Sequence, residues 1–159
     1  MNKKTKQIGT LVIMPLLLLM SCQNAETGSN KINTLCGFLK SINETSIMID
    51  EAEYVAPEDS QRIRELNLTE EDLLSGYYIY NPEEETKEYR LTSDTVYNFI
   101  DWERNFTDSD DPEEVNISTT DIDKFIKYIN TYTNAQPGMP FFFEIDGENI
   151  VSITEKPMA

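Results

Sequence analysis

Acidic side chains gather in one run near residue 110, and they are the first candidates for chemistry. Asp108, Asp110 and Asp111 recur at the spacing of loops that bind hard cations, and Glu113 follows two residues later. Calcium takes six to eight oxygen ligands, and the EF-hand loop needs a glycine at its sixth position. Counted from Asp108, that position holds Glu113, so the motif fails. We interpret the run as a solvated loop without a metal, with weak calcium binding by the three aspartates as the alternative.

Paired carboxylates are a second candidate for chemistry. Asp101, Glu103 and Glu144 could in principle supply the acid and base of a glycosidase. In a chain with 29 acidic residues, however, some pair always lies at a suggestive spacing. The pattern therefore predicts no catalytic residues and no cofactor, and hydrolysis of a cell-envelope polymer by paired carboxylates is kept as an alternative.

Aromatic side chains suggest binding instead. Successive strand residues face opposite ways, so Tyr78 and Tyr80 cannot share a face with Tyr77 and Ile79. One of these pairs belongs to the core. The other, with Trp102 at the end of a later strand, is a candidate platform for sugars, peptides or other flat apolar faces. The alternative is cross-strand packing with satisfied hydroxyls.

Composition excludes several classes of function. The 159 residues include 29 acidic and 13 basic side chains, a net charge of −16, and no histidine. Without histidine there is no Ser-His-Asp triad, no Cys-His pair and no His-ligated zinc. A surface this acidic repels phosphate backbones, so we expect no nucleic-acid partner.

The N-terminus has the pattern of an export signal. Three lysines lie within the first six residues, and an apolar stretch follows over residues 8–20. That stretch is too short to span roughly 30 Å of hydrocarbon as a helix. It ends in Leu19-Met20-Ser21-Cys22, which resembles the lipobox of bacterial lipoproteins. The resemblance implies that Cys22 carries diacylglycerol, which anchors the chain to the outer, extracytoplasmic face of a bacterial cell membrane.

Three segments follow from this pattern. Residues 1–21 are the expected lipoprotein signal peptide, 22–33 a polar tether, and 34–159 a single domain, which we expect to be a monomer. Removing residues 1–21 leaves 10 basic and 29 acidic side chains, a net charge of −19. If Cys22 is lipidated, Cys36 has no partner for a disulfide, and its apolar surroundings predict a buried core residue.

The periodicity of the domain is mostly that of strands. Alternating apolar and polar residues, as around Ile47 and Ile49, mark strands with one buried face. Strands are expected near 34–42, 45–55, 76–81, 87–92, 95–102, 140–146 and 149–155. Asp146-Gly147 predicts a tight turn between the last two.

Two helical segments interrupt the strands. A short helix is expected over 58–66, followed by one more turn that Thr69 caps. A longer helix over 119–132 has a stripe of four apolar residues at helical spacing, namely Ile122, Phe125, Ile126 and Ile129. Ser118 with Asp121, and Thr120 with Asp123, each fit a capping box at its start.

This pattern predicts a mostly β, α+β fold. We expect a small antiparallel, partly closed OB-like barrel, or a curved sheet, with one covering helix and one short helix.

Several blocks are similar to small secreted or lipid-anchored proteins of Gram-positive bacteria. They include 37–40, 99–102 and 140–142, and the most specific one is Gly76-Tyr77-Tyr78-Ile79-Tyr80-Asn81-Pro82. The resemblance implies a common fold and no catalytic or binding residues. The expected function is a lipid-anchored extracytoplasmic binding or accessory module for an envelope protein or glycan.

Overall fold

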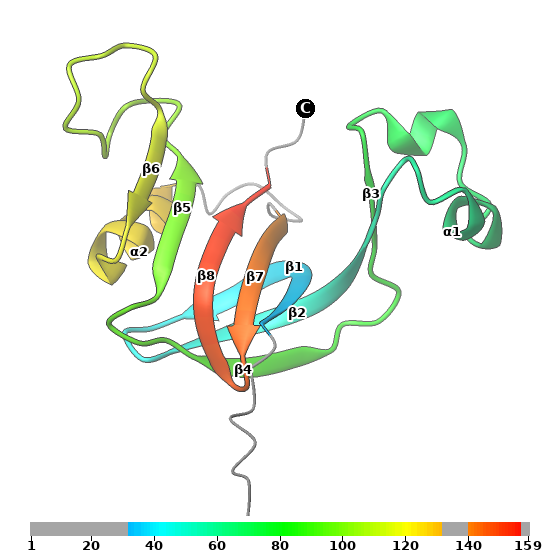
Figure 1. Ribbon diagram of the computed structural model, residues 1–159, viewed down its shortest axis with the longest axis horizontal. Helices are drawn as coiled ribbons and strands as arrows, with labels where there is room; N and C mark the ends of the chain where they lie inside the picture. The colour runs from blue at the N-terminus through cyan, green and yellow to red at the C-terminus, as the bar shows by residue number, and fades with distance from the viewer. Residues whose placement is uncertain (1–31, 132–139, 157–159) are drawn as a thin grey trace, which may run out of the picture.

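The computed structural model describes residues 32–131 and 140–156, and within these ranges the chain is mostly β (Figure 1). The strands are β1 (Asn33–Ile42), β2 (Ser46–Val55), β3 (Tyr78–Tyr80), β4 (Thr86–Arg90), β5 (Val96–Ile100), β6 (Asn116–Thr119), β7 (Pro140–Asp146) and β8 (Asn149–Glu155). The helices are α1 (Ser60–Glu65), the short 3-10 helix η1 (Glu70–Leu73) and α2 (Ile122–Thr131). None of these helices is long and apolar enough to cross a bilayer.

Five of the strands form a ring. β1 pairs with β2 on one edge and with β7 on the other, β7 pairs with β8, and β2 pairs with β4. The ring closes between β4 and β8 at a single parallel bridge, Arg90 to Asn149. The order β1-β2-β4-β8-β7 is that of a five-stranded Greek-key barrel of the OB type. The fold is therefore a partly closed, barrel-like α+β structure, as the alternating pattern predicts.

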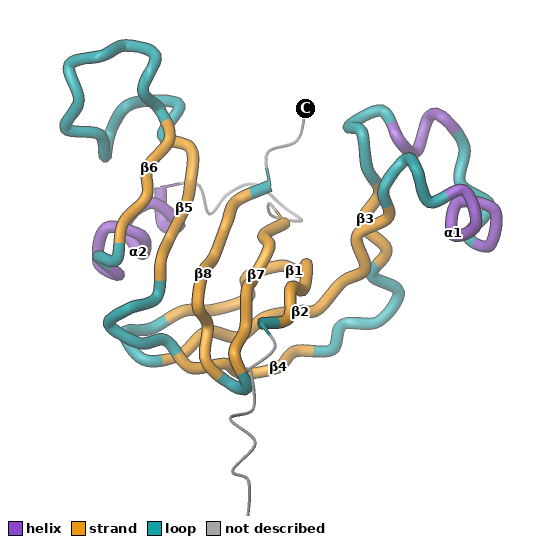
Figure 2. The backbone as a smooth tube through the Cα atoms, viewed as in Figure 1, coloured by secondary structure: helices purple, strands orange, loops and turns teal. Residues whose placement is uncertain are grey.

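Two extensions leave the ring on opposite flanks. β5 and β6 continue the sheet from β8, whereas β3 extends it beyond the far end of β2 (Figure 2). β5 and β8 run parallel, with Val96 opposite Ser152. The sheet is therefore mixed: the expected antiparallel pairing holds for every pair of described strands except β5 with β8 and β4 with β8. The parallel pairs join strands that are distant in sequence, which local alternation does not report.

The core fills the ring and the space between β5 and α2. Alternation places Ile47 and Ile49 of β2, and Phe141 and Phe143 of β7, on the inner face, with at most 3% of each side chain exposed. From α2, Phe125 stacks on Tyr97 with ring centroids 4.7 Å apart, and a stacked aromatic pair contributes beyond its buried area. α2 is thus the expected covering helix.

The start of α2 differs from the capping boxes expected at Ser118 and Thr120. Asp121 caps the helix, because its Oδ1 accepts the N–H of Lys124 at 3.1 Å. The preceding residues form β6, in which Ser118 lies opposite Asn98 of β5. The prediction of capping boxes at Ser118 and Thr120 is therefore wrong. The edge of β5 takes residues 116–119 as a strand partner, so tertiary pairing overrides the local capping signal.

Glu155 joins β8, β5 and α2. The parallel ladder between β5 and β8 ends at Asn98 and Thr154. Beyond it, Oε2 of Glu155 accepts the N–H of Ile100 at 2.7 Å and the hydroxyl of Tyr128 at 2.5 Å. The carboxylate thus replaces a backbone acceptor at the end of the ladder, and this explains an acidic residue that is only 5% exposed.

The segment between β2 and β3 is lightly packed. α1 begins at Ser60, with the carboxylate of Asp59 accepting the N–H of Arg62 at 3.0 Å. Thr69 is the N-cap residue of η1, as expected, but its hydroxyl donates: Asp72 accepts both the N–H and the hydroxyl of Thr69. None of the residues of α1 or η1 is buried. Their position therefore depends on polar contacts with β2 and β3.

Gly37 in β1 provides a test of the ring. A Cβ atom there would lie 2.5 Å from the carbonyl oxygen of Asp50 and 2.9 Å from Cγ2 of Ile49. We expect Gly37→Ala to lower the free energy of unfolding by about 1–3 kcal/mol, the usual cost of overpacking. Urea unfolding measures it as a lower midpoint at unchanged slope. Gly147→Asn is the control, because Asn tolerates the positive φ of that turn, and an equal loss in both variants would contradict the prediction.

Candidate functional site

A groove lies where β2 changes its partner. The last pair between β2 and β4 is Asp50 with Thr86, and the first pair with β3 is Glu53 with Tyr80. Between them the chain leaves the sheet over residues 81–85 (Figure 2). Pro82 has no N–H to donate, so this segment cannot simply continue the ladder. The result is a hollow beside β2, which we call the β2 groove.

Asp50 fixes one wall of the β2 groove. Its side chain is 1% exposed, and Oδ2 accepts hydrogen bonds from Nδ2 of Asn81 at 3.1 Å and from Nζ of Lys40 at 3.0 Å. The hydrogen bond to Asp50 raises the pKa of Lys40. Because Asn81 begins the loop and Lys40 belongs to β1, one carboxylate ties the loop to the barrel.

The β2 groove has a volume of about 860 Å³, an apolar floor and an acidic rim. Cys36 lies opposite both Ala52 and Phe142, so these three side chains share the outer face of the sheet. Tyr54 is two residues beyond Ala52 on the same face, and its ring meets that of Phe142 edge-on at 5.1 Å. The charged lining residues are Glu51, Glu53, Glu83, Glu85 and Lys87. Glu51 and Glu53 alternate with Ala52 and Tyr54 along β2, so their side chains project to the opposite face from the floor, and the carboxylates beside the floor are those of the loop.

Tyr77 supports the floor beside the groove. Its ring stacks on Tyr54 with centroids 5.3 Å apart, and Nζ of Lys156 lies 5.3 Å from the Tyr77 centroid and 5.9 Å from that of Tyr54. Tyr77 is 6% exposed, and burial raises the pKa of its hydroxyl. Tyr77, which lies just before β3, therefore packs on the same side as Tyr54, whereas Tyr78 and Tyr80 are half-buried on the other side, as alternation predicts.

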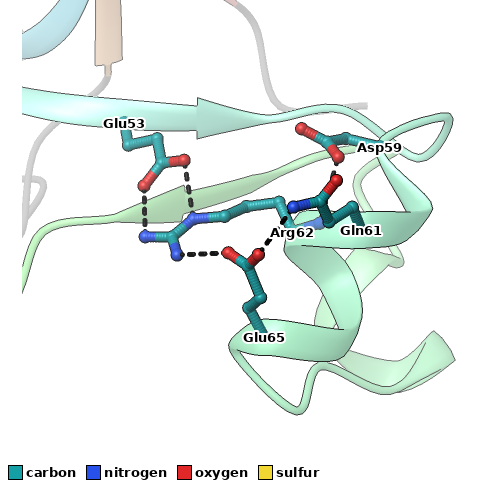
Figure 3. A network of polar contacts seen from close by, with 5 residues as sticks. All are labelled: Glu53, Asp59, Gln61, Arg62 and Glu65. Atoms are coloured by element: carbon teal, nitrogen blue, oxygen red, sulfur yellow. Dashed lines mark hydrogen bonds and ion pairs between the residues drawn. The ribbon is translucent and has the colours of Figure 1, made fainter.

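Arg62 neutralises one part of the rim. Figure 3 shows its guanidinium between Glu53 and Glu65, with the two nitrogens facing Glu53 at 2.8 and 2.7 Å from its oxygens. It also lies 5.2 Å from the centroid of Tyr80. These contacts raise the pKa of Arg62, mainly through the hydrogen bond to Glu53. Arg62 thus attaches α1 to β2 and β3 and covers one face of Tyr80.

The rest of the rim is less fully paired. Glu51 accepts a hydrogen bond from the Tyr89 hydroxyl, and one of its oxygens lies 3.8 Å from Nζ of Lys87. Glu83 and Glu85 are exposed, and neither forms a salt bridge with any residue in the described ranges. The rim therefore has two free carboxylates on the loop side.

The predicted binding residues are not brought together. Tyr80 lines the β2 groove, and its neighbour Tyr78 pairs with Val55 in the same ribbon. Trp102 is 66% exposed but follows β5, on the opposite flank of the sheet from β3 (Figure 1). A single platform of Tyr78, Tyr80 and Trp102 does not form. No local sequence pattern marks the floor of the groove, because the floor is assembled from β1, β2 and β7.

The acidic loop after β5 is organised around Arg104, which has a positive φ of 59°. Its guanidinium donates to the carbonyl oxygens of Ser109 at 2.6 Å, Asp111 at 2.6 Å and Glu114 at 3.2 Å. Asp108 and Asp111 do not converge: Asp108 faces Lys124 at 3.8 Å, and Asp111 accepts the N–H of Glu113.

The chain thus supplies its own cation to this loop. Asp108, Asp110 and Asp111 are not part of any cluster of three or more possible metal ligands in the described ranges.

The candidate catalytic carboxylates Asp101, Glu103 and Glu144 each accept hydrogen bonds within the fold. Asp101 is buried and accepts the backbone N–H groups of Asn105, Phe106 and Thr107 at 2.9, 2.6 and 2.9 Å. Glu103 bonds to Asn105 at the surface, and Glu144 accepts the hydroxyl of Ser152 on a different strand. Asp101 therefore acts as the cap of a turn, and the geometry gives no support to a glycosidase pair.

The fold and the β2 groove together define a small barrel protein with an open, acidic-rimmed surface hollow. Comparisons of the chain with protein-family models, with curated proteins and with solved structures find no match. The β2 groove is therefore the feature from which a function can be inferred.

Arg104 provides a test of the acidic loop. We expect Arg104→Met to speed Glu-C protease cleavage after Glu113 and Glu114 at least about tenfold, because a hydrogen bond to a charged group contributes about 1.5–3 kcal/mol. Cleavage is followed by mass spectrometry. Arg64→Met is the control, since Arg64 is exposed on α1 and far along the chain. If added calcium slowed Glu-C cleavage of the wild-type loop, the loop would bind calcium, and this would contradict the conclusion that the Arg104 guanidinium occupies it.

Cys36 provides a test of the floor. It is 4% exposed, and burial raises its pKa from the ordinary 9.0 to about 11. In a Cys22→Ser background we expect alkylation by iodoacetamide at pH 8 to be at least about 100-fold slower in the native protein than in urea, because the thiolate is that much rarer. The folded thiol holds its proton more tightly than the unfolded one, so stability falls as the pH rises above about 9.

The control for this measurement places a thiol two residues away on the same strand. A Cys36→Ala, Thr34→Cys, Cys22→Ser variant has its single thiol at an exposed position and should react at similar rates in both conditions. Fast native alkylation of Cys36 would show an accessible thiolate and overturn its assignment to the floor.

Proposed function

We propose that this protein is a lipid-anchored binding module on the extracytoplasmic face of a bacterial membrane, and that it contacts its ligand through the β2 groove. The observation that carries the proposal is the groove itself. About 860 Å³ of open volume combines a partly exposed aromatic floor with a rim of carboxylates. A concave surface of this size with a few placed polar groups is typical of a ligand site.

The N-terminal pattern supports the anchoring part of the proposal. The lysine-rich start, the apolar stretch and the Leu19-Met20-Ser21-Cys22 sequence lie outside the described residues, so this part depends on sequence. Lipid on Cys22 holds the domain near the bilayer, and the polar segment 22–33 separates them. Separation suits a domain with a net charge of −19, because an anionic surface repels it within the Debye length, about 8 Å at physiological salt.

The roles of the buried carboxylates in the described ranges favour binding over hydrolysis. Among the described residues the buried carboxylates Asp50, Asp101 and Glu155 are each held by hydrogen bonds that shape the fold. None of the three lines the β2 groove. The groove therefore offers recognition chemistry, with charge and apolar contact, and lacks a positioned acid and base.

An in-cell crosslinking experiment tests both parts. A photoreactive phenylalanine analogue replaces Glu85 in the groove rim in one variant and Glu113 in the acidic loop in the other. We expect a discrete adduct from position 85 and none from position 113, because only position 85 borders the groove. The adduct is detected as a mass shift on a denaturing gel.

A Cys22→Ala background provides the second arm. Without its lipid the chain should leave the membrane pellet, and the position 85 adduct should fall at least about fivefold. Retention in the membrane by the Cys22→Ala chain would refute the anchor. Equal adducts from positions 85 and 113 would refute the groove as the contact surface.

A further inference from the structure

We infer that the β2 groove binds a basic peptide segment in which apolar side chains are flanked by lysine or arginine. The inference names the ligand class of the site proposed above, and it rests on that proposal. Three features of the described residues support it: the apolar floor of the β2 groove, its acidic rim and the cation–π contacts of its aromatic rings.

The floor takes an apolar side chain. Ala52, Tyr54 and Phe142 are only partly buried, and with Cys36 they form a continuous outer-face surface across β2, β1 and β7. Ala52 is the smallest of the four, so the floor is lowest at the centre of β2. Burying one leucine-sized side chain there removes apolar area from water on both partners.

The rim takes cations. The lining residues include four glutamates and one lysine, and of the glutamates only Glu53 and Glu51 have basic partners within the described ranges. Glu83 and Glu85 stand on the loop that forms one wall. An ammonium or guanidinium group next to the bound apolar side chain, on the loop side of the groove, would reach them, and the strongly acidic chain favours its approach.

The aromatic rings around the groove already bind cations of the same chain. Within the described residues there are four cation–π contacts, two of them made by Lys156. Three of the four involve Tyr54 or Tyr80 of the lining, or Tyr77, which stacks on Tyr54; the fourth joins Lys87 of the lining to Tyr89 of the core. Lysine and arginine are thus the groups that this surface accepts within its own fold.

The same contacts argue for a peptide over a glycan. A sugar ring stacks on an open aromatic face, but Tyr54 is flanked by Tyr77, Phe142 and Lys156, and Arg62 lies over Tyr80. The floor combines the packed rings of Tyr54 and Phe142 with the methyl group of Ala52, an apolar surface that suits an aliphatic side chain. A phosphate-bearing ligand is disfavoured because carboxylates line the rim.

The test is fluorescence anisotropy with the full chain in phosphatidylcholine nanodiscs, whose neutral lipid does not attract a basic probe. The probe is a fluorescein-labelled octapeptide with two central leucines and three lysines on each side. We expect saturable binding in 50 mM salt. Replacing the leucines by serine, or the lysines by glutamate, should weaken it at least fivefold, and empty nanodiscs should not bind.

Three variants locate the binding. Glu83→Gln with Glu85→Gln should weaken binding at least threefold, whereas Glu113→Gln with Glu114→Gln, which changes charge equally in the acidic loop, should change it less than 1.5-fold. Ala52→Trp fills the floor without changing charge and should abolish saturation. The melting temperature of each variant confirms that it is folded, and the first two change only exposed side chains.

Equal weakening by the two charge variants would mean general electrostatic attraction, and it would overturn the inference. So would saturable binding of chitotetraose in place of the lysine peptide. Either result, or no binding at all, combined with a position 85 adduct in cells, would leave the proposed binding function standing with another ligand. If the position 85 adduct were also lost, both the basic-peptide inference and the proposed binding function would be overturned.

Discussion

The backbone pairing of β2 is the constraint on which the rest of the structure depends. Its first edge pairs with β1 along most of its length, whereas its second edge is divided between β4 and β3. The half that pairs with β4 belongs to the barrel, and the half that pairs with β3 extends outward with α1 and η1. The β2 groove is the consequence of that division, since two strands cannot occupy one edge without a break between them.

Buried carboxylates stabilise the irregular points that this architecture creates. Asp50 ties the loop at the groove to β1, Asp101 accepts three backbone N–H groups in the turn after β5, and Glu155 ends the ladder between β5 and β8. In each case the carboxylate accepts hydrogen bonds from groups that a regular ladder does not satisfy. An acidic residue in the interior of this protein is therefore a structural acceptor, whereas the acidic residues of the groove rim lie exposed.

Much of the fold could be predicted because strand alternation and helix caps are local. The alternation around Ile47 and Ile49 predicted β2, and the cap at Thr69 predicted η1. The strand β6 was not predicted because the sequence around Ser118 fits the local pattern of a helix N-cap equally well. The parallel pairings of β8 were missed because they depend on which distant strands meet. The role of Arg104 was missed too, since a guanidinium that binds three carbonyl groups leaves no spacing pattern.

The sequence by itself determined the strand-rich composition, the acidic character, the lack of histidine chemistry and the expectation of lipid on Cys22, because each of these is a property of residues or short segments. Only the tertiary structure decided that Tyr80 belongs to a groove and Trp102 does not, and that Cys36, Ala52 and Phe142 share one floor. The physical reason is that a floor made from three strands depends on register. The register that brings Phe142 beside Cys36 is set by backbone pairing between β1 and β7, segments about 100 residues apart, and no local pattern records it.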